Sequence, residues 1–343
     1  MNILKSLMDI FTSQNFIKVR GEIMETNKND IAVKVAILYY EKNKTQNEIA
    51  KEMNISRSYV SQLLTYARDN DIVRISIYVD EFSLRMIRKE IEFKNLFSSL
   101  KQAYIMNSES EDFTSLNLGK FAAPYIADFI SEANIIGINP GSSVDKTVKQ
   151  LKNKKILYNK DRKVVQIMDG YNSSFYSSYS QPNEIAKELG NVLSCESYYL
   201  NCPAVVEQKT LREQLVKENS ISKVIKFWKQ IDLAIMGLGV ADKRSKLFNL
   251  FNEESKKKIE KSNASGVINT SYFDENGVFV PIFEENKIGI PLENLKKIPR
   301  KVIISSGEYK SNALLGALRG GFVDILITDS LTIEAVEADI RHD

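Results

Sequence analysis

The chain has 343 residues, of which 43% are apolar and 27% are charged, with a formal net charge of +3. This length favours two domains, and the composition is typical of a soluble globular protein with ample apolar side chains for a core. So small a net charge excludes nucleic-acid binding through the overall field, and any such affinity must arise from a local face.

Cysteine and histidine are scarce. Cys195 and Cys202 lack the spacing of a metal or redox motif, and the only histidine is His342. We therefore expect free thiols in a reducing cytoplasm rather than a structural disulfide, and neither a metal site nor a cofactor. The sequence has no run of 18 apolar residues, so no membrane span is expected.

Residues 1–29 are interpreted as an N-terminal extension with weak organisation. They lack the long apolar core and the small-residue cleavage site of a signal peptide. Two interpretations stay open for this segment: a loose amphipathic helix or disorder, and a start-site artefact in which Met24 is the true first residue.

Residues 45–64, TQNEIAKEMNISRSYVSQLL, have the spacing of a DNA-reading helix-turn-helix. Thr45 and Glu48 stand in the capping-box relation, so we expect a first helix to start at Gln46. The small side chain of Ala50 suits the position where a second helix crosses closely. An amphipathic helix over residues 30–40 is expected to support the pair.

The second helix is expected to read DNA. Asn54 stands at the sharp turn, where a left-handed backbone is needed, and Ser56 is a good N-cap. The inward positions are apolar, whereas the outward positions bear groups that bond base edges and phosphates. We predict that the following residues contact DNA: Gln46, Ser56, Arg57, Ser58, Tyr59, Ser61 and Gln62.

The segments that follow complete a predicted DNA-binding domain over residues 30–80 and a linker helix over residues 81–101. The β-branched run IVRISIYV, residues 72–79, suggests a short strand or wing. The linker has helical periodicity, and its apolar residues face either the core or a partner subunit: Leu84, Ile87, Ile91 and Leu96. An ordinary helical hairpin with a solvated polar face is the alternative to the DNA-binding interpretation.

From residue 102 to residue 343, β-rich runs alternate with helical stretches, which predicts an α/β domain with a parallel sheet covered on both faces. The expected strands are residues 103–107, 134–139, 164–168, 233–239, 301–307 and 324–329. The expected helices include residues 116–132, 144–151, 181–193 and 311–319.

One strand end has the composition of an anion site. The run NIIGIN leads into PGSSVDKTV, so Gly141, Ser142 and Ser143 open a helix whose free amides and hydroxyls suit a phosphate. The loop has neither nucleotide-binding glycine pattern, so a single phosphate on a sugar fits better than a nucleotide. An N-capped helix after a tight turn is the structural alternative.

Other strand ends carry polar groups or glycines that permit close approach of a ligand. Lys310 is expected to supply a positive charge to the phosphate. Because open parallel sheets bind ligands at the carboxyl ends of their strands, we expect one effector pocket formed by the following residues: Gly141, Ser142, Ser143, Asp169, Gly237, Gly239, Lys310 and Asp329.

From residue 31 to its end, the chain resembles the SorC-type bacterial transcriptional regulators, which sense phosphorylated sugars. The run LYYEKNKTQNEIAKEMNISRSYVSQLLTYARDNDIVRISI looks like the family's DNA-binding segment, whose recognition helix begins at a Ser-Arg pair, here Ser56-Arg57. The resemblance implies a C-terminal domain with the fold of sugar-phosphate isomerases and a phosphate loop, here GINPGSS, residues 137–143.

The likeness extends over DLAIMGLG and the tail KVIISSGEYKSNALLGALRGGFVDILITD. The sequence departs from the family pattern at Pro140, where an aromatic residue is usual, and at Val267, where an acidic residue is usual. Thr270-Ser271 replace a Gly-Arg pair. Other positions of this sequence match the family pattern. They are Gly237, Gly239, Gly307, Lys310, Arg319, Gly320, Thr328 and Asp329.

We therefore expect a cytoplasmic transcriptional regulator of a carbohydrate-metabolism operon. Its expected partners are double-stranded operator DNA, a phosphorylated sugar or polyol, and further copies of itself in a homodimer or homotetramer. Two alternatives stay open: a sugar-phosphate isomerase-like enzyme with an accessory DNA-binding segment, and a sugar-binding module whose helix pair contacts protein. Turnover of sugar phosphates indicates an enzyme, whereas saturable binding without turnover indicates a sensor.

Overall fold

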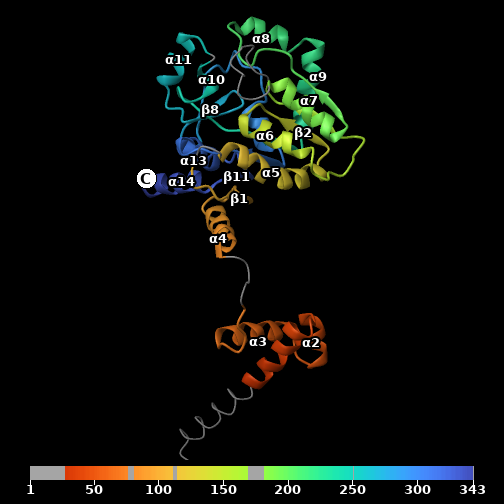
Figure 1. Cartoon of the computed structure of the whole chain (residues 1–343). Coiled ribbons are helices and arrows are strands. Elements are labelled where there is room, and N and C mark those ends of the chain that lie inside the picture. Colours follow the sequence, from red (N-terminus) through yellow and green to blue (C-terminus); the bar gives the residue numbers. More distant parts are fainter. Residues whose placement is uncertain (1–27, 76–80, 111–113, 169–180, 250, 343) are drawn as a thin grey trace, which may run out of the picture. The chain divides into compact units, whose positions relative to one another are not determined.

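The structure is a computed structural model that describes residues 28–75, 81–110, 114–168, 181–249 and 251–342. The chain forms two compact units, Met1–Val79 and Asp80–Asp343, and each is described by itself (Figure 1). Among the described residues, no helix is long and apolar enough to cross a membrane.

The first unit contains the predicted helix-turn-helix. Residues 28–36 are α-helical and continue into a π-helical turn, η1 (Ile37–Glu41), before α2 (Gln46–Glu52) and α3 (Arg57–Asp69). The capping box is confirmed, because Thr45 N donates to Glu48 Oε2 at 2.8 Å and Glu48 N donates to Thr45 Oγ1 at 3.3 Å. Asn54 has the left-handed conformation expected at the turn, with φ of 55°.

The strand or wing expected over residues 72–79 is wrong for residues 72–75, which are irregular. The β-branched composition has no neighbouring strand to pair with in the described part of this unit, so its propensity is not expressed. Ile72 and Val73 instead pack on the apolar core of the helices. The rest of the segment, from residue 76, lies outside the described residues.

The second unit is built on a seven-stranded sheet in which every neighbouring pair is parallel, as the alternation of strands and helices predicted. The spatial order is β1-β11-β10-β5-β2-β3-β4. The strands are β1 (Gln102–Met106), β2 (Ile135–Ile138), β3 (Lys163–Gln166), β4 (Glu196–Tyr198), β5 (Leu233–Met236), β10 (Arg300–Ile304) and β11 (Ile325–Asp329).

Helices cover both faces of this sheet, and the strands are largely buried because each face meets apolar side chains (Figure 1). One face packs on α5 (Thr114–Ser131), α6 (Ser142–Leu151) and α7 (Pro182–Leu193). The other face packs on α4 (Glu81–Asn95), α9 (Asn219–Phe227), α12 (Leu292–Lys297), α13 (Ser311–Arg319) and α14 (Ser330–His342).

The unit also contains a second, antiparallel sheet, which the sequence did not predict. Its order is β6 (Gly239–Val240), β7 (Gly266–Ile268), β8 (Ser271–Phe273) and β9 (Phe279–Val280). Three short helices complete the unit: α8 (Lys209–Leu215), α10 (Lys246–Asn249) and α11 (Glu253–Glu260), together with the 3-10 turns η3 (Trp228–Gln230) and η4 (Glu308–Lys310). This sheet matters because β6 and β7 contribute to a pocket.

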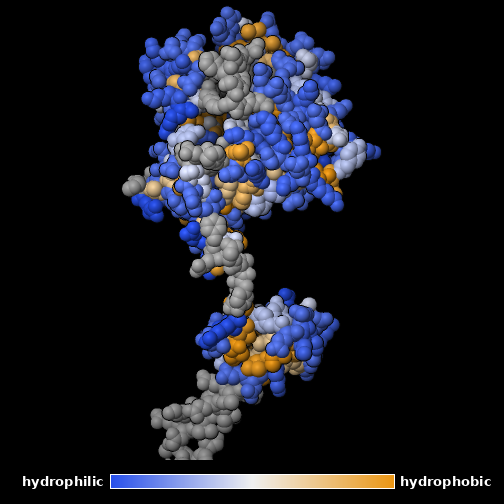
Figure 2. All heavy atoms as spheres, viewed as in Figure 1, coloured by the Kyte–Doolittle hydropathy of each residue, from blue (hydrophilic) through white to orange (hydrophobic). Residues whose placement is uncertain are grey.

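The expected linker helix is α4, which belongs to the second unit and packs on its apolar core. Phe93 on α4 is buried, and Glu90 Oε1 accepts a hydrogen bond from Ile105 N of β1 at 2.8 Å. The opposite face of the helix stays exposed: Ile87 is 46% and Ile91 is 56% accessible. On the face of this unit seen in Figure 2, hydrophilic residues predominate and apolar residues form small groups among them.

Candidate functional site

The start of α3 presents the polar face that the sequence predicted. Ser56 Oγ accepts a hydrogen bond from Tyr59 N at 3.1 Å and so caps the helix. Val60, Leu63 and Leu64 are buried against the rest of the unit. The predicted DNA-contacting side chains are therefore outward: Ser56, Arg57, Ser58, Ser61 and Gln62 are exposed, and Tyr59 and Gln46 are half-buried.

A hollow lies beside this face and brings Gln46 at the start of α2 next to Arg57 at the start of α3. Lys44, one of the basic residues of this segment, shares the hollow with four side chains that sequence reasoning did not single out: Tyr39, Tyr40, Asn43 and Asn47. Lys44 forms an ion pair with Glu52, so part of its charge is compensated within the unit. Arg57 at the helix start is the cation best placed on this face for a base or phosphate contact.

The second unit has a pocket at the topological switch point of its parallel sheet. Along the chain, β2, β3 and β4 extend the sheet in one direction, whereas β5, β10 and β11 extend it in the other. The crevice lies outside the carboxyl ends of β2 and β5, where such sheets bind ligands. The loops after these two strands lie close together: a Cβ atom added to Gly141 would be 3.5 Å from Gly237 Cα.

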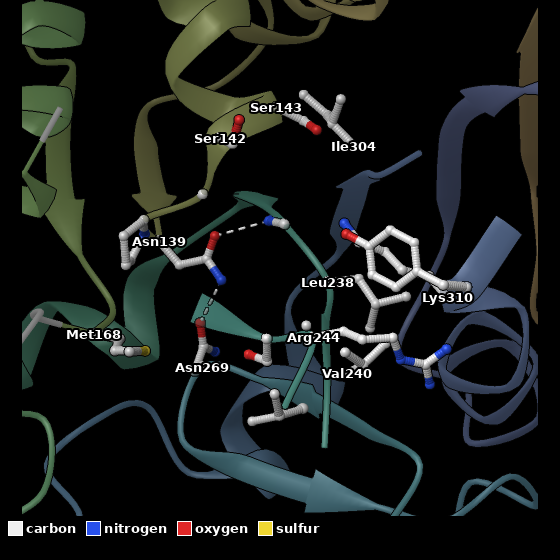
Figure 3. Close-up of a pocket in the computed structure, with 17 residues that line it drawn as sticks. Asn139, Ser142, Ser143, Met168, Leu238, Val240, Arg244, Asn269, Ile304 and Lys310 are labelled. Atoms are coloured by element: carbon white, nitrogen blue, oxygen red, sulfur yellow. Dashed lines mark hydrogen bonds between the residues drawn. The ribbon is translucent and has the colours of Figure 1, made fainter. Parts of the chain in front are cut away.

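The pocket has a volume of about 200 Å³, which suits a small ligand (Figure 3). Its lining comes from the ends of β2, β3, β5 and β10, the start of α6, the turn η4 and the second sheet. The lining residues are Asn139, Pro140, Gly141, Ser142, Ser143, Met168, Gly237, Leu238, Gly239, Val240, Arg244, Ser245, Val267, Asn269, Ile304, Tyr309 and Lys310.

Six of the eight predicted effector residues meet in this pocket: Gly141, Ser142, Ser143, Gly237, Gly239 and Lys310. Asp169 lies outside the described residues. Asp329 is buried at the end of β11 and does not line the pocket, because its carboxylate caps α14: it accepts from Thr332 N at 3.0 Å and from Thr332 Oγ1 at 2.7 Å. Asp329 therefore acts on the pocket only through its charge.

Lys310 supplies the positive charge of the pocket. Its Nζ lies 3.3 Å from the neutral hydroxyl Oγ of Ser305, and the carboxylate whose charge acts on it is that of Asp329. Burial lowers the pKa of Lys310 to about 8, and the charge of Asp329 opposes that shift. An anion bound beside Lys310 would stabilise its charged form and raise this pKa further.

A second cation, Arg244, is already engaged. Its Nε donates to both carboxylate oxygens of Asp242 at 3.0 Å, and this contact holds the pKa of Asp242 below its usual value. The guanidinium also lies over the Tyr309 ring, 5.6 Å from its centroid. Arg244 therefore forms part of the wall with its charge compensated, whereas Lys310 has charge available for a ligand.

Two amides line the side of the pocket opposite Lys310 and Arg244, as Figure 3 shows. Gly237 N donates to Asn139 Oδ1 at 2.8 Å, and Asn139 Nδ2 donates to Asn269 Oδ1 at 3.0 Å. These bonds join the loops after β2 and β5 to the turn between β7 and β8. Sequence reasoning missed Asn269 and Arg244 because the second sheet was not foreseen. It also missed Asn139, although that residue ends the NIIGIN strand and gave a signal at a strand end.

The described residues contain no group of three or more histidine, cysteine, aspartate or glutamate side chains that could hold a metal ion. Neither Cys195 nor Cys202 forms a disulfide. Among the described residues, the pocket offers one available cation, helix-start amides, hydroxyls and two neutral amides, which is a binding arrangement.

Each of the two units matches a known protein family. Residues 83–336 match the family model of the sugar-binding domain, and residues 34–70 match that of sigma-70, region 4, a helix-turn-helix. The deoxyribonucleoside regulator of Bacillus subtilis is 27% identical over 322 residues, which are 92% of this chain and 100% of that protein.

Solved structures of transcriptional regulators are also similar to this chain. The full-length sorbitol operon regulator SorC of Klebsiella pneumoniae is 26% identical, with a TM-score of 0.68, covering 89% of this chain and 97% of that one. A transcriptional regulator from Streptococcus pneumoniae TIGR4 is 26% identical, with a TM-score of 0.67, covering 76% and 99%. These relatives confirm a regulator and not an isomerase. The chain belongs to the SorC-type family of sugar-binding, DNA-binding transcriptional regulators.

Proposed function

We propose that the pocket binds a phosphorylated sugar or polyol and that this effector changes the affinity of the protein for its operator. The observation that carries the proposal is Lys310, an available cation in the same pocket as the start of α6. The phosphate accepts bonds from the helix-start amides and from Ser142 and Ser143, and Lys310 compensates its charge.

The carbohydrate operon is part of the same proposal. The relatives include a sorbitol operon regulator and a deoxyribonucleoside regulator, whose names indicate a polyol and a pentose derivative. A pocket of about 200 Å³ suits a molecule of that size. As a regulator of operator DNA, the protein acts in the cytoplasm.

The outward face of α3 is proposed to enter the major groove of the operator. Arg57, at the first position of the helix, is the side chain best suited to a bidentate contact with guanine. The exposed serines and Gln62 are proposed to make the remaining contacts with the DNA. Gln46 on α2 is proposed to contact a phosphate of the DNA backbone.

Regulation requires more than one subunit, because paired recognition helices match half-sites roughly 34 Å apart or a multiple of that. The exposed pair Ile87 and Ile91, one turn apart on α4, supports a contact with a second copy. Replacing both with serine should shift the protein toward monomer in light scattering. An unchanged mass would place the subunit contact elsewhere.

Calorimetric titration of sugar and polyol phosphates into the full chain tests the effector. Lys310→Met should reduce the affinity for the phosphate at least tenfold, because it leaves the anion without its cation. Lys297→Met, at an exposed position of α12, is the matched control and should bind normally. Equal binding by all three proteins would contradict the proposed phosphate site.

A further inference from the structure

The hydrogen bonds between the two pocket amides fix which way each amide faces. Gly237 N–H can only donate, so Asn139 must present its oxygen to Gly237 and its nitrogen to Asn269. Asn269 must in turn present its oxygen to Asn139. The Nδ2 group of Asn269 is therefore left over as a donor, and this assignment follows from the network.

This donor has no partner among the described residues. Asn269 is 4% exposed, its Nδ2 atom is buried, and the side chain lines the pocket. A buried N–H without an acceptor is costly, so its retention at a pocket wall points to a ligand atom. The backbone of Asn269 is also held in the left-handed region, at φ of 57°, which fixes where the amide lies.

The surroundings decide what kind of atom this donor binds. Figure 3 shows Asn269 and Met168 on the side of the pocket away from Lys310 and Arg244. Val267, on β7, also lines the pocket and is apolar. Among the described residues that line this side, a charged group would meet neutral amides, a thioether and an aliphatic side chain, and no compensating charge.

We propose that Asn269 determines effector specificity by donating a hydrogen bond from Nδ2 to an uncharged oxygen, a hydroxyl or carbonyl, at the end of the ligand remote from its anionic group. Asn139 positions that donor by holding the amide in one orientation. The effector is thus anionic at one end only, a sugar or polyol that carries one phosphate rather than two. This inference rests on the proposed function of the same pocket.

The test is calorimetric titration of the full chain with three sets of probes: inorganic phosphate, a panel of three- to six-carbon sugar and polyol monophosphates, and the same sugars and polyols without phosphate. Asn269→Gly removes the amide at a position where glycine adopts the backbone easily. Asn201→Gly is the matched control, since Asn201 also has positive φ, at 50°, and also accepts from an asparagine, Asn183.

We predict that Asn269→Gly lowers the affinity for the tightest-binding monophosphate about tenfold or more and leaves the affinity for inorganic phosphate unchanged. Asn201→Gly should bind every probe with the affinity of the wild type. Unchanged monophosphate binding by Asn269→Gly, or an equal loss for inorganic phosphate, would overturn the role of Asn269 and leave the proposed phosphate site standing. Binding of only unphosphorylated sugars, weakened by Asn269→Gly, would support Asn269 and contradict the phosphate site. No binding of any probe would contradict both.

Discussion

Lys89 Nζ on α4 and Glu334 Oε1 on α14 form an ion pair of 2.8 Å. The pair joins the helix that follows the DNA-binding unit in sequence to the helix that follows β11. The lysine side chain is 18% exposed and the glutamate side chain 59%, so water screens this ion pair in part.

A short series of contacts leads from α14 to the pocket. Thr332, near the start of α14, donates to Asp329 and accepts from Gly307 N at 2.8 Å. Gly307 immediately precedes η4, which contains Lys310. We therefore expect a ligand that moves Lys310 to act on the turn, on α14 and on α4 through these adjoining groups.

Lys89→Met should weaken communication between effector and operator without abolishing either binding event. An ion pair of this kind is worth up to about 1 kcal/mol, so the effector-induced change in operator affinity should shrink by up to about fivefold. Operator titrations with and without effector measure this change. Lys94→Met, at an exposed position on the same helix, is the control, and identical coupling in both variants would exclude this contact from the route.

Arg57→Ala should lose roughly 1–3 kcal/mol of operator binding, because a bidentate contact to guanine is removed while the helix stays folded. Lys42→Ala, at an exposed position outside α3, should instead reduce the salt dependence and leave sequence preference intact. Band-shift titrations at two salt concentrations separate these effects. Full affinity in folded Arg57→Ala would remove this residue from the interface.

Effector binding should depend on pH through Lys310, whose pKa is about 8 in the ligand-free protein. A bound anion raises that pKa, so binding takes up a proton above pH 8. Affinity should therefore be steady from about pH 7 to about 8 and fall by up to about tenfold per pH unit above it. Calorimetry from about pH 7 to about 10 measures this, and Lys310→Met should show no such decline. A flat wild-type profile would rule out titration of Lys310.

Gly307→Ala should lower the free energy of unfolding by about 1–3 kcal/mol. Gly307 has φ of 116°, and an added Cβ would lie 2.6 Å from Tyr309 Cε1. Gly141→Ala is the matched control, because φ is 172° there and the nearest atom lies at 3.5 Å. Scanning calorimetry compares the two, and equal unfolding temperatures would show that the turn before η4 adapts without strain.

Much of the fold was predictable because local pattern and tertiary structure agree. The Thr45–Glu48 box and the Ser56 cap are short-range signals, and six strands of the parallel sheet, of which all but the edge strand β1 are largely buried, read as largely apolar runs. The second sheet was missed because its strands have two or three residues, too few to show a period. β4, three residues at the sheet edge, was missed for the same reason.

The pocket was predictable only where it consists of strand ends. Lys310 and the loop from Gly141 to Ser143 follow predicted strands, so the rule for parallel sheets placed them together. Asn269 and Arg244 come from the second sheet and its neighbouring loop, whose position depends on tertiary packing. Asp329, also at a strand end, caps α14 and does not line the pocket, because a polar residue at a strand end serves equally well as a helix cap.

The central claim is that one molecule couples an effector pocket to operator binding. The most direct measurement is fluorescence anisotropy of an operator DNA, selected by the full chain from a random library, titrated with and without a saturating sugar phosphate that calorimetry shows to bind. We predict a change in operator affinity of about 5- to 150-fold, lost in Lys310→Met. An operator affinity that stays the same with every sugar phosphate that binds would contradict the account.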